Sequence, residues 1–239
     1  MLKQTRFTNF TLEQTIIHHL MMKSTFINDF GLLYGKMGIS LFFYEYSKFK
    51  NEITYREFAK ELLESICNII HKRIPIEFNS GLSGIAWGLE YLIQNHFIRR
   101  KSNDICNEID QYIMRTDIKR IINNEFLKED LENFLHYILA RISGSWKQNK
   151  SFPFDSLYID DLYSNLSILQ KEKNISINTQ SLIKSFFLCI EQKNIIDYNF
   201  DISLFINKKN IKKNIYSCEF GLKKGLAGYL LHQTKIVDL

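Results

Sequence analysis

The chain alternates between two kinds of helical pattern. Residues 39–49 and 85–94 are apolar on nearly every side, which is typical of buried helices. Residues 54–73 instead carry an apolar stripe opposite a charged face, as a helix on the outside of a fold requires. Thr54 is expected to cap this outer helix and Pro75 to end it. The pattern predicts an all-α protein in which inner and outer helices alternate.

The same periodicity places the remaining helices. Thr11 is expected to cap a first helix that runs to Met22. Inner helices are expected near 39–49, 85–95, 131–142 and 226–233, and further helices from Ser102 or Asn103 onward and over 154–169 and 179–191. The polar stretch 143–151 is interpreted as a linker. The lysine- and asparagine-rich stretch 197–214 is interpreted as a short strand or loop.

Pairs of glycines three residues apart precede three of the inner helices. The pairs are Gly35 and Gly38, Gly81 and Gly84, and Gly225 and Gly228. The first two pairs start 46 residues apart, and a similar step reaches Asp130 and Asn133, which stand where another pair would fall. A fixed period of this length indicates one structural unit per repeat. Glycine allows a tight loop to approach neighbouring backbone, so these positions are predicted to be structural.

These loops carry a family resemblance. The stretches GLLYGKMGISLFF, SGLSGIAWGLEYLI and GLKKGLAGYLL resemble the glycine-rich repeats of lanthionine synthetase C-like proteins, and Glu108-Ile-Asp110 adds to the likeness. The resemblance implies an α/α toroid, in which inner helices line a central cavity and outer helices surround them. Enzymes of that family are usually longer, so a reduced or incomplete toroid formed by a single domain over 1–239 is expected.

The resemblance also implies a zinc site, but its ligands are missing. Active members hold zinc through one cysteine of a Trp-Cys-x-Gly loop and through a Cys-His pair just before a glycine loop, and the metal activates the thiol of a substrate cysteine. Here Lys223 and Lys224 stand in place of the Cys-His pair, and no Trp-Cys-x-Gly occurs. Protonated amines do not ligate zinc, which needs three protein ligands and one open position in a catalytic site. No cofactor is therefore expected.

Other residues were considered as ligands or catalysts. Cys218 and His232 flank the last glycine loop and are the remaining metal candidates, whereas the adjacent His18 and His19 point in different directions on a helix. Glu45 and Glu90 follow their glycine loops at similar offsets. They could supply the two carboxylates of a glycan-cleaving site, although a partner-bonded carboxylate is the simpler interpretation.

Composition limits which partners and which cellular compartment are expected. The chain has 239 residues, is 45% apolar, and carries a net charge of +5. Neither basic run, Arg99–Lys101 or Lys208–Lys213, has interleaved aromatics, so both are interpreted as solvated loops and no nucleic-acid partner is expected. No apolar stretch is long enough to span a membrane, and no signal-peptide pattern opens the chain. The four cysteines form no CxxC pair, and a cytoplasmic protein is expected.

Two functions remain open at this point. The first is a non-catalytic, zinc-less relative of the peptide cyclases that binds a peptide or partner protein in lanthipeptide-type maturation. It explains the retained glycine loops together with the lost ligands. The second is an enzyme, either a zinc-dependent cyclase with displaced ligands or a carbohydrate-acting toroid. Metal analysis of the purified protein separates the two.

Overall fold

A computed structural model of the chain describes residues 11–70, 74–115, 119, 128–171, 175–191, 198–206 and 214–234. Over these ranges the regular structure is helical, without strands, which confirms the all-α prediction. The α-helices are α1 (Leu12–Lys23), α2 (Lys36–Lys50), α3 (Ile53–Cys67), α4 (Leu82–Gln94), α5 (Ser102–Met114), α7 (Lys128–Asn149), α8 (Ser156–Leu169), α9 (Ile177–Glu191) and α10 (Leu226–Gln233). The 3-10 turns are η1 (Ser24–Phe26), η3 (Ile202–Phe205) and η4 (Ile215–Ser217).

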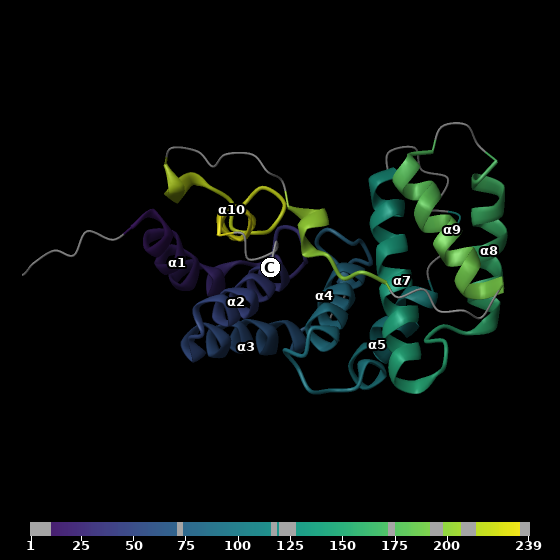
Figure 1. The fold of residues 1–239 in the computed structure, drawn as a ribbon, viewed down its shortest axis with the longest axis horizontal. Helices are drawn as coiled ribbons and strands as arrows, with labels where there is room; N and C mark the ends of the chain where they lie inside the picture. The colour runs from purple at the N-terminus through teal and green to yellow at the C-terminus, as the bar shows by residue number, and fades with distance from the viewer. Residues whose placement is uncertain are drawn as a thin grey trace, which may run out of the picture.

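The inner helices follow one another along an arc. Helix α10 contacts α2, α2 contacts α4, and α4 contacts α7 (Figure 1). The outer helices cover this row, with α1 against α10, α3 against α2, α5 against α4 and α7, and α9 against α7. Helices α1 to α3 and α10 lie at one end of the molecule, and α7 to α9 lie at the other (Figure 1). The protein is an incomplete α/α toroid, as predicted.

Burial separates the two kinds of helix in the way the sequence pattern predicts. Every residue from Lys36 to Ser47 of α2 and from Leu82 to Ile93 of α4 is buried. Only the apolar stripe of α3 is buried, and its charged face is exposed. One apolar cluster joins side chains from α1 through to α10. None of the helices within the described ranges is both long and apolar enough to cross a bilayer.

The predicted helix ends are right at α1 and wrong at α3. Thr11 caps α1, since its side chain accepts from the Gln14 backbone N–H at 3.2 Å while the Gln14 side chain accepts from the Thr11 N–H at 2.9 Å. Helix α3 starts one residue before Thr54, and its N-cap, Glu52, makes no side-chain cap bond. It ends at Cys67, well before Pro75, so the proline does not set its C-terminus.

The second half of the chain departs most from expectation. The stretch 143–151 is expected to be a linker, but residues 143–149 form the last turns of α7, and Ser143, Gly144 and Ser145 are buried. Helix α7 already begins at Lys128, so Asp130 and Asn133 lie inside a helix and do not form a degraded glycine loop. In the predicted strand or loop at 197–214, the described residues hold a 3-10 turn.

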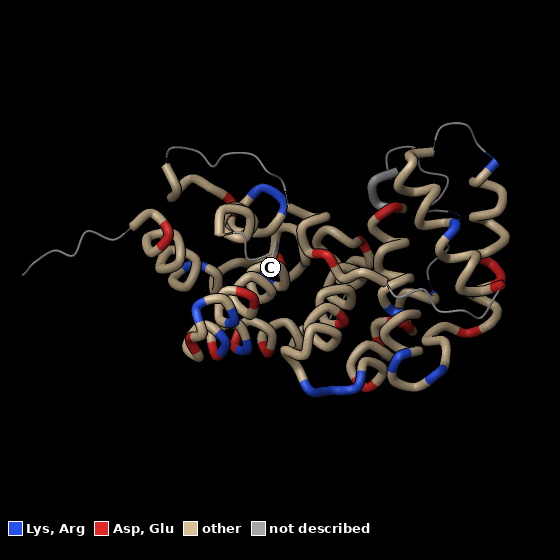
Figure 2. The backbone as a smooth tube through the Cα atoms, viewed as in Figure 1, with Lys and Arg blue, Asp and Glu red and all other residues tan. Residues whose placement is uncertain are grey.

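Charged residues lie mostly on the outer turns of the backbone (Figure 2). The loop between α4 and α5, drawn blue at the bottom of the view, carries the basic run at 99–101, and all three of its side chains are exposed. This placement agrees with a solvated loop. The second basic run, at 208–213, lies outside the described residues.

Candidate functional site

The three glycine loops share one backbone pattern. In each loop the first residue of the inner helix donates its N–H to the carbonyl seven residues earlier, at 2.8 to 2.9 Å. The pairs are Lys36 to Asp29, Leu82 to Pro75, and Leu226 to Glu219. The repeated unit therefore starts six residues before the first glycine. It is longer than the Gly-x-x-Gly signature alone indicates.

The loops are also bonded to one another across the end of the arc. The Leu33 N–H donates to the Asn79 carbonyl at 2.9 Å, and the Lys223 N–H donates to the Leu33 carbonyl at 3.0 Å. One carboxylate, that of Asp29, accepts from the Gly31 N–H and from the Ser80 hydroxyl, each at 2.7 Å. Backbone contacts therefore join loops that lie far apart in the sequence.

Each second glycine lies directly against a carbonyl. A Cβ at Gly38, Gly84 or Gly228 would overlap the carbonyl oxygen of the residue six positions earlier in its own loop. None of the described glycines has a positive φ, so close approach, and not a left-handed backbone, explains these three positions. The effect of the glycines on stability stays a prediction.

The two lysines at the expected ligand positions do not form a metal site. Lys224 is exposed and Lys223 is half-buried on the last glycine loop. The Cys218 thiol lies 3.5 Å from the Asn214 carbonyl oxygen, and His232 is exposed near the end of α10. Within the described ranges, no three His, Cys, Asp or Glu side chains are grouped so as to hold a metal ion. The residues present therefore do not fit a zinc ion of the expected kind.

A pocket opens beside the last glycine loop. It has a volume of about 530 Å³, and its lining includes Lys224, Glu219, Cys218 and Tyr34. His19 lies near this region, because its ring stacks on Phe220 at 5.3 Å between centroids. The preceding residue, His18, is exposed, whereas His19 is buried, so the two histidines point in different directions as predicted. The pocket presents one cation and one carboxylate to solvent, without a catalytic pair.

Glu45 and Glu90 are both buried, but each has its own partners. The Tyr91 hydroxyl donates to the Glu45 carboxylate at 2.5 Å, whereas Glu90 is paired with Arg141 on α7. Burial raises the pKa of Glu45, and the bond from Tyr91 opposes that change. The structure therefore places the two carboxylates in separate hydrogen-bonded groups, which favours the partner-bonded interpretation over a glycan-cleaving pair.

Arg141 is the centre of a buried charge network. Its guanidinium, which has no exposed surface, binds the carboxylate of Glu90 and, through Nε at 3.0 Å, both oxygens of Asp110. The Tyr137 hydroxyl also donates to Asp110, at 2.6 Å, and the Ser102 hydroxyl donates to Glu90. Burial alone would lower the pKa of Arg141, but its acidic neighbours raise it. The arginine therefore stays charged.

Sequence reasoning missed most of this network. In the sequence, Asp110 stands out only through the family resemblance, and Arg141 lies inside an apolar run. Gly144 gives a signal that was assigned to a linker, since a Cβ there would overlap the Glu90 carboxylate. A glycine within a helix, a charge within an apolar run and a carboxylate on an inner helix could together have indicated a buried ion pair.

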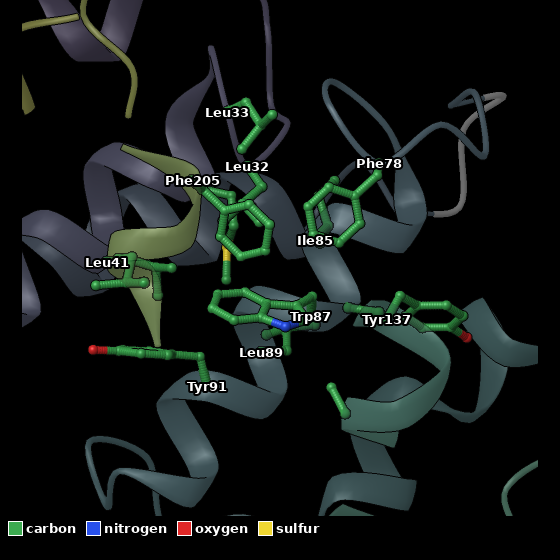
Figure 3. Close-up of a cluster of buried hydrophobic side chains, with 14 of the residues drawn as sticks. Leu32, Leu33, Leu41, Phe78, Ile85, Trp87, Leu89, Tyr91, Tyr137 and Phe205 are labelled. Carbon is green, nitrogen blue, oxygen red and sulfur yellow. The ribbon is translucent and has the colours of Figure 1, made fainter. Parts of the chain in front are cut away.

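A third cluster lies on the inner face of α4 and α7. Trp87 is fully buried, and its indole N–H donates to the Tyr198 hydroxyl at 3.0 Å. The same hydroxyl lies 2.8 Å from Nδ1 of His136. Phe205 of η3 stands over the indole in Figure 3, with ring centroids 4.9 Å apart, and next to Phe78. Residues 198–206 thus cover the face where the arc is concave.

Comparison with known proteins finds similarity to one family over part of the chain. Residues 26–131 match the family model described as lanthionine synthetase C-like protein. No curated protein and no solved structure matched the chain. The matched region spans the first two glycine loops and helices α2 to α5, so it includes Trp87, Glu90 and Asp110 but not Arg141.

Proposed function

We propose, from the match of residues 26–131 to the lanthionine synthetase C-like family model, that this protein binds a peptide or partner protein in lanthipeptide-type maturation and works without zinc. One observation carries the proposal. The last glycine loop keeps the shared hydrogen-bond pattern, yet its two ligand positions hold Lys223 and Lys224. The loop is retained as a structural unit while the metal chemistry is absent from it.

The chemistry of the donors supports the same proposal. Lys224 is exposed, and its ammonium group is repelled by a metal cation. The separate pairing of Glu45 and Glu90 gives no support to a carbohydrate-acting site. Binding is also consistent with the concave face of the arc, where Trp87 and His136 offer aromatic surface and hydrogen bonds to a chain segment.

Metal analysis tests the zinc-free part of the proposal. Protein purified without added metal is expected to contain no stoichiometric zinc, and added zinc is expected not to raise its melting temperature, because a ligand stabilises only the state that it binds. The double change Lys223→Cys with Lys224→His supplies two ligands but no third, so we expect weak metal binding at most. One zinc per chain that chelators remove with loss of stability contradicts the proposal.

Peptide binding tests the other part. The parent protein is titrated calorimetrically with a cysteine- and serine-rich precursor peptide, before and after dehydration of the peptide's serines. We expect the precursor peptide to bind. A scrambled peptide of the same composition is the control. If neither precursor form binds more tightly than the scrambled peptide, the peptide-binding proposal is wrong.

A further inference from the structure

The segment Tyr198–Ile206 lies on the inner face of the arc. In Figure 1 it runs, in yellow-green, from the α9 side toward α10, and it passes α4 and α7. Within the segment, the side chains of Ile202 and Phe205 are buried, whereas that of Leu204 on the same 3-10 turn is 55% exposed. The segment therefore has one face on the inner helices and one face in solvent, as a bound peptide would.

Its contacts are mostly made by side chains. Tyr198 and Phe200 are two residues apart, and the centroid of the Phe200 ring lies 6.1 Å from that of Trp87. The centroid of the Phe205 ring lies 4.9 Å from that of Trp87 and 5.7 Å from that of His136. Its polar contacts to the inner face include the Tyr198 hydroxyl, which lies within hydrogen-bond distance of Trp87 and His136.

The backbone of the segment bonds mainly to itself. The N–H groups of Asp201, Leu204 and Ile206 donate to carbonyls within 198–206. Among the described contacts to the inner helices, the backbone bond runs from the Tyr198 N–H to the Ser143 hydroxyl and is long, at 3.4 Å. The glycine loops differ, because they exchange backbone bonds of 2.9 to 3.0 Å with one another. A segment fixed by rings and one hydroxyl can leave without disrupting the backbone bonding of the helices that it covers.

We infer that the face formed by Trp87, Phe78 and His136 is a docking site for a peptide whose aromatic residues are spaced as Tyr198, Phe200 and Phe205 are. The chain's own segment Tyr198–Ile206 occupies the site in this structure and competes with an external peptide. This inference rests on the proposed function and adds its regulation. An attached segment competes with an effective concentration of the order of millimolar, so only a peptide of higher affinity, or a weakened segment, opens the face.

The test supplies the segment in trans. The probe is the nonapeptide Tyr-Asn-Phe-Asp-Ile-Ser-Leu-Phe-Ile, the sequence of 198–206. All proteins carry Trp146→Phe, so that Trp87, the second of the two tryptophans, reports alone by fluorescence. The test variant adds Tyr198→Ala with Phe205→Ala, and the matched control adds Leu204→Ala on the same turn. Circular dichroism establishes that each variant is folded.

The test variant is expected to show red-shifted Trp87 emission and to bind the nonapeptide at least about tenfold more tightly than the parent or the control, with recovery of the parent emission. Equal binding by all three proteins, or a folded test variant with parent-like emission, overturns the inference. If the double variant does not fold, Tyr198→Phe decides by the same measurements, with a smaller expected shift.

The outcome is separable from the proposed function. A protein that holds zinc, or that ignores the precursor peptide, contradicts the proposed function even where the nonapeptide binds the test variant. Conversely, a precursor peptide that binds the parent without changing Trp87 emission supports the proposed function and overturns this inference, because binding then takes place elsewhere.

Discussion

The two ends of the helix arc hold their inner helices in different ways. Helices α2, α4 and α10 are fixed at their N-termini by glycine loops that exchange backbone hydrogen bonds. Helix α7 lies in the same row, but the charged side chain of Arg141 fixes it near its middle. A backbone anchor tolerates many side chains and demands glycine at points of contact. A side-chain anchor demands particular charged residues instead. Substitutions in each anchor therefore show how much each one contributes to stability.

Removal of the side-chain anchor is expected to have the largest effect. Arg141→Met leaves the carboxylates of Glu90 and Asp110 buried without a cation, so we expect the free energy of unfolding to fall by about 3–5 kcal/mol. Urea unfolding followed by circular dichroism measures it. Lys147→Met, at an exposed position further along the same helix, is the control.

A triple variant sharpens this test. Replacing Arg141, Glu90 and Asp110 together by Met, Met and Leu removes the whole set of charges, and replacement of a buried ion pair by apolar residues of similar volume is often close to neutral. We therefore expect the triple variant to recover a large part of the stability that Arg141→Met loses. A single variant within about 1 kcal/mol of the parent would show that the network does not hold α7 in place.

The backbone anchor is expected to give the intermediate effect. Gly84→Ala and Gly228→Ala each place a methyl group against a carbonyl oxygen of the same loop, so we expect a loss of about 1–3 kcal/mol from each. Gly88→Ala is the matched control on α4, because a Cβ there meets the flexible side chain of Met37. Thermal melts compare the three. Variants of Gly84 and Gly228 that melt with the parent contradict the packing role.

The backbone-anchored end was the more predictable one. The glycine pairs and the all-round apolar runs depend on neighbours close in the sequence, and the helices that they predicted at 39–49, 85–95 and 226–233 are present in α2, α4 and α10. The limits of α7 were not predictable in this way. Within its polar C-terminal turns, Ser143 and Gly144 are buried against partners distant in the sequence, namely Tyr198 and Glu90.

The candidate sites follow the same division. Sequence reasoning located the last glycine loop and its two lysines, because the loop is a local motif. It did not find the face around Trp87, since His136 and Tyr198 lie 62 residues apart and meet only through the fold. Nor does a pattern of single positions show that Glu45 and Glu90 point to different partners.

The smallest expected effect is on the pH dependence of stability, through His136 on α7. Burial lowers the pKa of His136, and Glu132 opposes that change only in part. The folded state therefore holds fewer protons than the unfolded state, whose histidine titrates near 6.5. The stability that the neutral ring contributes is complete above that pH and is lost as the pH falls through it toward the folded-state pKa. His19, with its pKa also lowered by burial, adds to the loss at the glycine-loop end.

The carboxyl groups act in the opposite direction, so the histidine contribution needs a difference measurement. Burial raises the pKa of Glu45 and of Glu90, and their protonation favours the folded state as the pH falls. We expect the parent to lose more stability than His136→Gln between about pH 7.5 and 5.5 in urea unfolding. His232→Gln, at an exposed position on α10, controls for the removal of one imidazole. If His136→Gln and the parent lose stability in parallel, protonation of His136 does not oppose the packing of Tyr198 on α7.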